Sequence, residues 1–539
     1  MSQNVRLASQ LLASRKLRGE PFNQGIVPAV PRDGATIFLI GGAHMKPINI
    51  GGHAAYQTRL ISQLKKYYPD ALVRLPPAVW DTIEAFYTLD LSSIDLVMAD
   101  RYSVFGPVPR LPSDMVRSML IALKFKKHNY TDWSAELKIN PLAAILSGFV
   151  VGDTPGIGTF YDFSDRLWLS NRDNIFPHAQ PPKVKVVKPK NPDEKADPVE
   201  KITVEEFLRQ LEESPPTDDQ PYARLFQIFN NLFLQHSADL GLIDLNNLVL
   251  SGDGTPVETM HRNRYRRLCK CREKGIMDCK CNRYYSQPDT NCGYDSSRHK
   301  NYYGYDLYMM TAADSYSDLP VFPLLGQGST HDSFGFCSTY FAMTAFLKEI
   351  NVSEVLLDSA HDAMAIYQFL QKNSVRAIID LNERKGVSFE YKDNFTVGKD
   401  GIPVCKAGLK MIRDGTEKDR MRIKYRCPNC YHPDGIHCDH KCSDSDYGRV
   451  VHVATKDNPR LFTIPPRESV EWKEEYKKRT SSERCNKREK EDYHLESGKH
   501  RSTKMWYCRL YCIMMCQHLD AWGSAPSTSS LRDILAQAA

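Results

Sequence analysis

The order of apolar segments between Leu248 and Asp380 constrains the fold more than any other feature of this chain. Short runs rich in Val, Leu, Ile and Tyr alternate with longer segments whose apolar residues recur at helical spacing. The predicted strands are Leu248–Ser251, Tyr305–Thr311, Val321–Leu325, Val355–Leu357 and Val375–Asp380, and the predicted helices are Cys337–Glu349 and Ala363–Lys372. This pattern indicates an α/β domain built on one sheet.

The succession of these elements narrows the fold class. Three strands come first, and a helix, a strand, a helix and a strand follow them. That order fits a ribonuclease H-like α/β sheet. Because 539 residues exceed what one compact core usually holds, we expect further domains around it.

Composition and periodicity divide the rest of the chain. Helical spacing from Ser113 to Lys127 opens a helical domain at 111–176, in which Thr131 is the expected N-cap of a second helix, and further helices are predicted at Pro141–Ser147 and Gly158–Leu169. DNA binding of helix-turn-helix type and a plain helical scaffold both remain open for it. The segment 177–221 is a linker rich in Pro and charge, with one short helix at Val204–Glu213. Residues 1–110 form an N-terminal region of unclear role, with no motif in 1–91, and 523–539 are expected to form a flexible tail with a polar start.

Charge and hydropathy limit which kinds of partner the protein can have. The net charge is only +6, but basic residues crowd Arg262–Lys274 and Lys473–Arg509, where aromatic residues interleave with them. A solvated charged surface is the ordinary explanation, and contact with a DNA backbone is the alternative. No apolar run is long enough to span a bilayer and no secretory signal is visible, so we expect a cytoplasmic protein without membrane contact.

Two aspartates follow predicted strands. Asp253 comes directly after the apolar run NLVLSG, and Asp358 closes EVLLD. Carboxylates that converge from distant strand ends are the ligands Mg²⁺ prefers, whereas many such aspartates only form turns or cap helices. Asp362, four residues beyond Asp358, is the main rival for the second position, and Asp358 is preferred because it ends its strand directly.

A third acid stands in the segment YKKRTSSERCNKREK. Its spacing, Tyr-x2-Arg-x3-Glu-x6-Lys, predicts that Tyr476, Arg479, Glu483 and Lys490 lie along one side of a helix. A carboxylate suited to a metal ion is thus flanked by cations suited to phosphates.

With this spacing, the chain resembles the bacterial insertion-sequence DDE transposases, specifically the group whose Glu-bearing helix has a Tyr-Arg-Glu-Lys signature. The resemblance extends over roughly 111–522, through LSGDGTPV, HKNYYGYDLYMM, STHDSF, LLDSAHD and the block after Trp472. It implies a ribonuclease H-like catalytic domain at 222–383 and 471–522, interrupted by an insertion at 384–470.

The family resemblance also implies the chemistry. Asp253, Asp358 and Glu483 would hold Mg²⁺ or Mn²⁺ and catalyse cleavage at transposon ends, followed by joining of the freed 3′-hydroxyl to target DNA. Tyr476, Arg479 and Lys490 would contact DNA phosphates. The expected partners are double-stranded terminal repeats and target DNA, bound by a homodimer or higher oligomer at the bacterial nucleoid.

Two other functions remain open, namely a zinc-containing DNA-binding protein of this fold without catalysis and a ribonuclease H-like nuclease that does not transpose. His331 and Asp332 in STHDSF could position DNA or a ligand, but a turn and helix cap is the preferred interpretation. The Gly326 and Gly328 pair lacks a nucleotide-loop pattern.

Grouped cysteines predict metal sites rather than disulfides. One cluster is Cys427, Cys430, Cys438 and Cys442, near His437 and His440, and the other is Cys269, Cys271, Cys279 and Cys281, with Cys292 further on. Four thiolates suit tetrahedral Zn²⁺ in a structural role. One shared site, an iron–sulfur cluster or unliganded thiols are the alternatives. Cys508, Cys512 and Cys516 recur every four residues in an apolar helix and are expected in the core.

Overall fold

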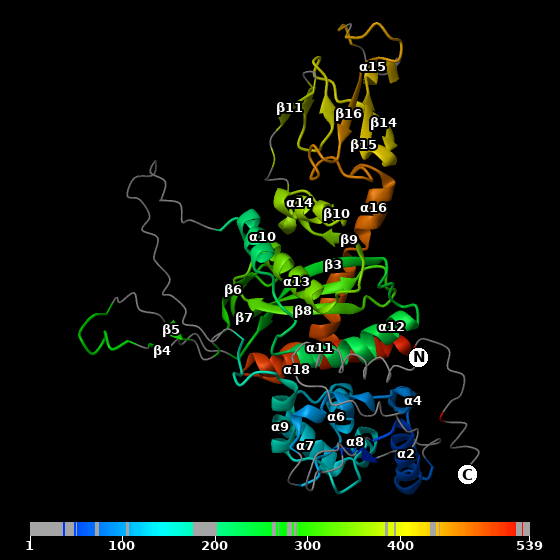
Figure 1. Ribbon diagram of the computed structural model, residues 1–539, viewed down its shortest axis with the longest axis vertical. Helices are drawn as coiled ribbons and strands as arrows, with labels where there is room; N and C mark the ends of the chain where they lie inside the picture. The colour runs from blue at the N-terminus through cyan, green and yellow to red at the C-terminus, as the bar shows by residue number, and fades with distance from the viewer. Residues whose placement is uncertain are drawn as a thin grey trace, which may run out of the picture.

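The computed structural model describes residues 36–37, 48–49, 51–70, 75–103, 107–175, 202–523 and 531, with short gaps at 261–265, 268, 278–282, 285–286, 288, 383–385, 387, 393–394, 432–437 and 441. Figure 1 shows three levels along the long axis, with a helical body below, a mixed sheet in the middle and a β-rich extension above. The protein is therefore mixed α/β, as the strand and helix pattern predicts.

The central sheet is built around β3 (Leu248–Glu258). It pairs antiparallel with β7 (Lys300–Ala312) on one side and parallel with β9 (Val352–Leu357) on the other. β8 (Pro320–Gln327) and β6 (Asn291–Asp295) both pair antiparallel with β7, and β10 (Arg376–Ile379) pairs parallel with β9. All five predicted strands are present in this sheet; β3, β7, β8 and β9 are longer than predicted and β10 is shorter.

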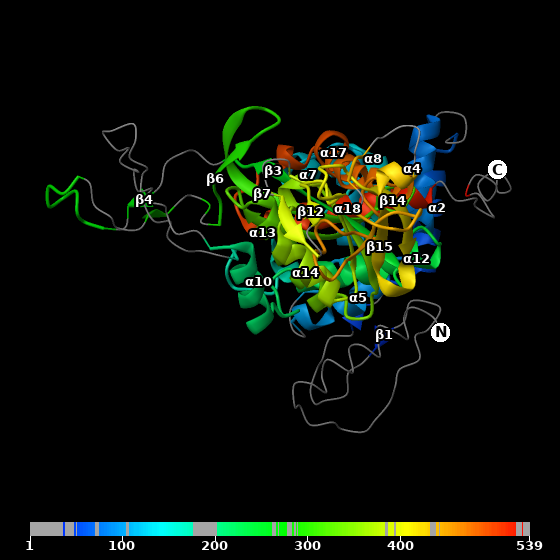
Figure 2. The ribbon, with the colours of Figure 1, turned by 90° about the horizontal axis from the view of Figure 1, so that it is seen from above.

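Helices cover both faces of the sheet. On one face, α13 (Asp332–Phe346) packs so closely that a methyl group on Gly335 would lie 2.7 Å from the Tyr308 ring. On the other face, Trp472 of α16 (Val470–Lys477) packs with Val249 and Leu356, and α17 (Thr480–Lys487) follows it. Figure 2 shows α17 and α13 on opposite sides of β3 and β7, with α14 (Met364–Lys372) on the α13 side. The sheet is therefore buried from both sides, as apolar parallel strands require.

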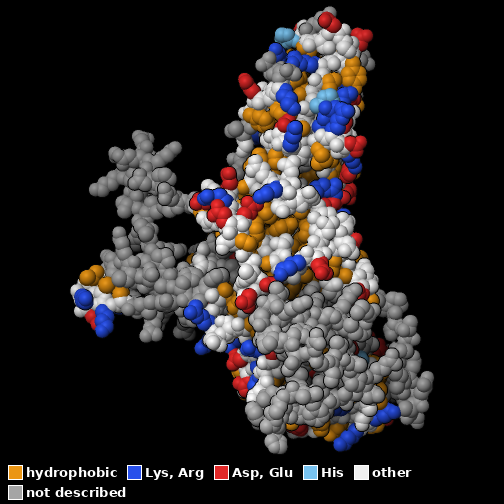
Figure 3. Space-filling model, in the orientation of Figure 1, with side chains coloured by type: hydrophobic (Ala, Val, Ile, Leu, Met, Phe, Trp, Pro, Cys, Tyr) orange, Lys and Arg blue, Asp and Glu red, His pale blue; other side chains and the backbone are white. Residues whose placement is uncertain are grey.

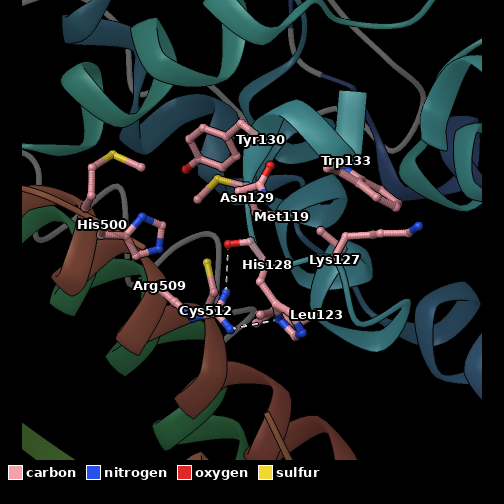
Figure 4. Close-up of a pocket in the computed structure, with 12 residues that line it drawn as sticks. Met119, Leu123, Lys127, His128, Asn129, Tyr130, Trp133, His500, Arg509 and Cys512 are labelled. Atoms are coloured by element: carbon pink, nitrogen blue, oxygen red, sulfur yellow. Dashed lines mark hydrogen bonds between the residues drawn. The ribbon is translucent and has the colours of Figure 1, made fainter. Parts of the chain in front are cut away.

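Beneath the sheet lies α18 (Thr503–Trp522), a helix buried on nearly all sides. Cys508, Cys512 and Cys516 are buried in it, which confirms their predicted place in the core. Arg509 of this helix donates to the backbone oxygen of His128 in the helical body beside a cavity of about 40 Å³ (Figure 4). A helix that is apolar all round belongs between two layers, and α18 joins the sheet to the helical body.

The helical body contains every helix predicted between 111 and 176 and begins upstream of that range. Tyr56 of the first long helix donates its hydroxyl to Leu146 O, and Arg59 pairs with Asp114. The second predicted helix is capped by Asn129, whose side chain accepts from Asp132 N, so the expectation of Thr131 as N-cap is wrong. The helices are α2 (His53–Tyr67), α4 (Pro77–Thr88), α5 (Ser93–Val97), η1 (Ala99–Arg101), α6 (Pro112–Lys124), α7 (Tyr130–Ile139), α8 (Pro141–Ser147) and α9 (Ile157–Leu167).

Between the body and the sheet, the short helix predicted within the linker is confirmed as α10 (Val204–Glu213). Its Phe207 ring lies 5.0 Å from Phe334 of α13, so this end of the linker packs on the sheet domain. Residues 177–201 lie outside the described residues, as do 524–530 and 532–539 of the tail. The chain then enters the sheet through α11 (Ala223–Phe229), η2 (Asn230–Leu234) and α12 (Gln235–Asp239).

Between β10 and α16 the chain leaves the sheet and forms a β-rich extension, where the insertion is predicted. A separate apolar cluster that includes Phe395, Ile423 and Phe462 forms its core. Figure 3 shows Lys and Arg side chains along its surface. Its elements are β11 (Phe389–Tyr391), β12 (Phe395–Val397), β13 (Pro403–Val404), β14 (Ile412–Glu417), η4 (Lys418–Arg420), β15 (Arg422–Arg426), α15 (Pro428–Tyr431) and β16 (Val450–Ala454).

Two short pairs of strands lie outside these sheets, β1 (Thr36–Ile37) with β2 (Ile48–Asn49) and β4 (Arg266–Arg267) with β5 (Arg283–Tyr284). Within the described part of the chain, no helix is both long and apolar enough to cross a bilayer.

Candidate active site

Strand register brings the first two predicted acids together. β3 and β9 run parallel with Ser251 opposite Leu356, so Asp253 and Asp358 occupy matching positions two residues further on. Side chains alternate between the faces of a sheet, which places both on the face that carries α16 and α17. The two aspartates, 105 positions apart in the sequence, thus become neighbours through the pairing of two strands.

The predicted position of Asp253 at a strand end is wrong. It is the sixth residue of the eleven in β3, which continues to Glu258 in antiparallel pairing with β7. Only the parallel partner stops nearby, because β9 ends at Leu357. The Asp253 side chain therefore lies just past the end of β9, on a part of β3 that pairs only with β7.

Burial and neighbouring carboxylates both raise the pKa of Asp253. Burial raises its pKa, and the charges of Asp332 and Asp358 raise it further, to about 7. Asn486 of α17 donates to Asp253 Oδ2 at 3.4 Å. A buried carboxylate close to two others is a place where a bound cation would relieve repulsion.

Asp358 is held by its own loop. Its carboxylate caps the 3₁₀ turn η3 (Ser359–His361), accepting from Ala360 N at 3.0 Å. His361 Nδ1 lies 2.7 Å from Asp358 Oδ1, while its Nε2 lies 2.8 Å from the hydroxyl of Tyr308. Partial burial of Asp358 opposes ionisation, but the hydrogen bond with His361 prevails and its pKa is lowered. His361 and Tyr308 are both buried, so they fix the direction of this carboxylate.

The rival second acid, Asp362, has a different environment. Its side chain is fully buried and accepts two hydrogen bonds of 2.7 Å from Arg460 of the extension. Asn382 N donates to it as well, at 2.8 Å. Asp362 thus ties the extension to the sheet, which agrees with the preference for Asp358 as the second acid.

The segment with the Tyr-Arg-Glu-Lys spacing is not one continuous α-helix. Tyr476 lies in α16, where its ring stacks on Trp472 at 4.9 Å, and Arg479 lies at the junction before α17. Glu483 lies in α17, and Lys490 lies in η5 (Arg488–Asp492), a π-helical turn. The prediction of a single helix side is therefore wrong for the segment as a whole, because the junction and the π turn both change the phase of the side chains.

Three of the four signature residues still meet. The Arg479 guanidinium lies 5.6 Å from the centre of the Tyr476 ring and donates to Glu483 Oε1 at 2.8 Å. The charge of Asp253 reaches Arg479 and contributes to raising its pKa, which burial opposes. The Glu483 carboxylate is half exposed and turned to Arg479.

Lys490 lies apart from these three. Burial lowers its pKa, and the charges that act on it come from residues such as Glu496, Arg298 and Asp295. It faces the β6 end of the sheet, where its charge also acts on Asp306 of β7. A direct contact between Lys490 and Glu483 is not part of the described structure.

The helix bearing Glu483 is anchored to β3 by two serines. Ser251 Oγ donates to Arg479 O at 2.7 Å and lies 2.8 Å from Ser482 Oγ. These bonds set the height of α17 above Asp253. The sequence alone had not singled out Ser251, Asn486, His361 or Tyr308, although HD within LLDSAHD already showed a histidine three residues after Asp358.

The motif STHDSF has two roles. His331 caps α13 through Nδ1, which accepts from Ser333 N at 3.2 Å, so the expected helix cap is confirmed for it. Asp332 is the first residue of α13 and lies among the carboxylates, where burial raises its pKa and the charge of Asp358 adds to the effect. Its place near Asp253 was missed because the two positions are 79 residues apart.

The cysteine clusters are only partly described. Cys279, Cys281 and His437 lie outside the described residues, and Cys269 and Cys271 lie in the loop before them. In the second cluster, Cys427 directly precedes α15 and Cys430 lies within it, and a methyl group on Gly448 would lie 2.7 Å from Cys430 Sγ. Burial raises the pKa of Cys430, and the neighbouring Cys427 contributes.

Across the residues that the structure covers, no set of three or more His, Cys, Asp or Glu side chains is arranged to hold a metal ion. Zinc at either cysteine cluster therefore stays a prediction. At the sheet, Asp253 and Asp358 supply carboxylate oxygens, the donor type that Mg²⁺ and Mn²⁺ prefer, and Glu483 lies on the adjacent helix α17.

No protein-family model matches the chain, and no curated protein is significantly similar to it in sequence.

Proposed function

We propose that the protein is a DNA transposase that cleaves at transposon ends and transfers the 3′-hydroxyl to target DNA. The observation that carries the proposal is the meeting of Asp253 and Asp358 beneath a helix that presents Arg479 and Glu483. The same three acids are those that the resemblance to the DDE transposases implies.

The sheet supports the fold part of this proposal. Three antiparallel strands in sequence order, β3, β7 and β8, are followed by α13, β9, α14 and β10, with β9 and β10 parallel to β3. This is the succession expected of a ribonuclease H-like domain. Such a domain places its acids where β3 and β9 meet, with an insertion before the Glu-bearing helix.

The donor set indicates which metal would be bound. Asp253, Asp358 and Glu483 would hold Mg²⁺ or Mn²⁺, which when bound stabilises charge on the attacking and leaving oxygens. His361 orients Asp358, and Asn486 holds Asp253. Glu483 would exchange its bond with Arg479 for the metal, which frees the guanidinium for a DNA phosphate.

DNA contact would involve the same face. Arg479 and Tyr476 lie beside the acids, whereas Lys490 would meet DNA at the β6 end of the sheet. Two DNA ends must be brought together for transposition, so we propose that the protein acts as a homodimer or larger oligomer on DNA in a bacterial nucleoid.

The decisive experiment is metal-dependent cleavage of DNA that carries the coding sequence and its flanking ends. Asp253→Ala, Asp358→Ala and Glu483→Gln should each abolish nicking while DNA binding is retained. Glu491→Gln is the matched control, because Glu491 is exposed on the next turn and contacts only Lys487 among the described ion pairs. Cleavage that survives any one of the three changes would overturn the assignment of that residue.

The same assay separates the other candidate functions. Nicking without joining of the 3′-hydroxyl to target DNA would identify a nuclease. Binding without nicking, in parent and variants alike, would identify a DNA-binding protein that uses this fold without catalysis.

A further inference from the structure

A second group of carboxylates faces the opposite side of β3 from the proposed catalytic acids. Gly254 stands between Asp306 of β7 and Asp332 of α13. A methyl group on Gly254 would lie 2.6 Å from Asp332 Oδ1 and 3.2 and 3.3 Å from the two oxygens of Asp306. Three carboxylate oxygens therefore converge on one small space that is open because residue 254 has no side chain.

Asp306 lacks a partner for its charge. Its side chain is only 7% exposed, and its Oδ2 is buried without a hydrogen-bond partner in the described structure. The positive charge that acts on Asp306 is that of Lys490. Lys490 makes no hydrogen bond to Asp306 in the part of the chain described. A buried carboxylate without a partner is strongly unfavourable, so this arrangement calls for a bound cation or a shared proton.

We propose that Asp306 and Asp332 bind a hard divalent cation, Mg²⁺ or Ca²⁺, in the space above Gly254. Oxygen ligands at 2.0–2.6 Å suit these ions, and one or two carboxylates with water in the remaining positions are a usual set. The ion would hold the first turn of α13 against β3 and β7. The site is independent of the proposed function, because it requires neither Glu483 nor DNA.

A tyrosine close to the proposed site can report the binding of a metal ion. Tyr308 lies two residues from Asp306 on the same face of β7, and it is buried close enough to Asp332 for that charge to add to the rise of its pKa caused by burial. A lanthanide bound beside a tyrosine becomes luminescent when the ring is excited. Tb³⁺ is therefore the probe, and Ca²⁺ and Mg²⁺ serve as competitors.

The experiment uses the full chain with Asp358→Asn and Glu483→Gln, which removes two of the three proposed catalytic ligands and leaves Asp253 in place. We expect saturable Tb³⁺ luminescence that Ca²⁺ or Mg²⁺ displaces, with affinity reduced at least tenfold by Asp306→Asn or Asp332→Asn. Gly254→Ala should abolish the signal by filling the space while both carboxylates remain. Gly158→Ala is the matched control, since a methyl group there meets nothing within 4 Å.

Two results would overturn the proposal. The first is absence of saturable luminescence in the double-variant chain, which would mean that the carboxylates share a proton. The second is binding that neither Asp306→Asn nor Asp332→Asn weakens, which would place the ion elsewhere. Circular dichroism checks that each variant is folded, and the isosteric Asn variants decide the question if Gly254→Ala does not fold.

Discussion

Arg460→Met should destabilise the protein far more than any change to Asp358, although Asp358 and Asp362 are only four residues apart. The Asp362 side chain is fully buried and Arg460 is 11% exposed, so removing the guanidinium strands a charge in the interior. Breaking a buried pair in this way costs about 3–5 kcal/mol. Asp358 is 37% exposed, and an asparagine there can keep its hydrogen bonds with Ala360 N and His361, so Asp358→Asn should change the free energy of unfolding by less than about 1 kcal/mol.

The assay is urea unfolding followed by circular dichroism, in parallel with the cleavage assay. The double variant Asp362→Leu with Arg460→Met should recover most of the lost stability, because apolar residues often replace a buried ion pair without loss. Asp358→Asn should abolish cleavage and leave the unfolding curve nearly unchanged. The reasoning is refuted if Arg460→Met unfolds like the parent while Asp362→Asn abolishes cleavage at full stability, since Asp362 would then be the second acid.

Three further predictions concern a buried glutamate, a residue that orients Asp358, and the cysteine cluster of the extension. Glu489 is wholly buried, neither of its oxygens has a partner in the described structure, and burial raises its pKa from 4.5 to about 8. Its ionisation therefore removes stability as pH rises from about 4.5 through 8, by up to about 5 kcal/mol, and Glu489→Gln should abolish that loss in urea unfolding measured across this pH range. His361→Asn keeps a donor near Asp358 but cannot reach Tyr308, so we expect Mn²⁺ affinity to fall about 10–100-fold with little change in DNA binding; an unchanged Mn²⁺ titration would contradict the positioning role. Purified protein should contain structural zinc that Cys430→Ser lowers and that Cys405→Ser, at a partly buried cysteine outside the cluster, does not; metal analysis that finds no zinc in the parent would exclude the zinc site.

The helices and strands were largely predictable because their patterns are local. Periodicity placed α10 and α8 at their observed bounds, and it found every strand of the central sheet except β6. It failed at the start of α7, where both Asn129 and Thr131 are residue types that can cap a helix and the structure uses Asn129. It also failed where a strand continued through Gly252 and Gly254, since glycines usually signal a turn.

The residues of the candidate site were predictable only in part. Asp253, Asp358 and Glu483 follow from motif and order in the sequence. Tyr308 and Asn486 do not, because their roles arise from the pairing of β3 with β7 and from the height of α17 above the sheet. Local sequence patterns do not predict which side chains from distant segments will come into contact.

The sequence by itself determined the elements, their order and the chemical types available, because hydrophobic period and residue identity act locally. Tertiary structure decided which carboxylates became neighbours. It separated Asp358, at the sheet edge, from Asp362, buried on Arg460, and it placed Asp306 and Asp332 around Gly254. The physical reason is that burial, register and charge pairing depend on contacts between segments far apart in the chain, which form only when the sheet and its covering helices pack together.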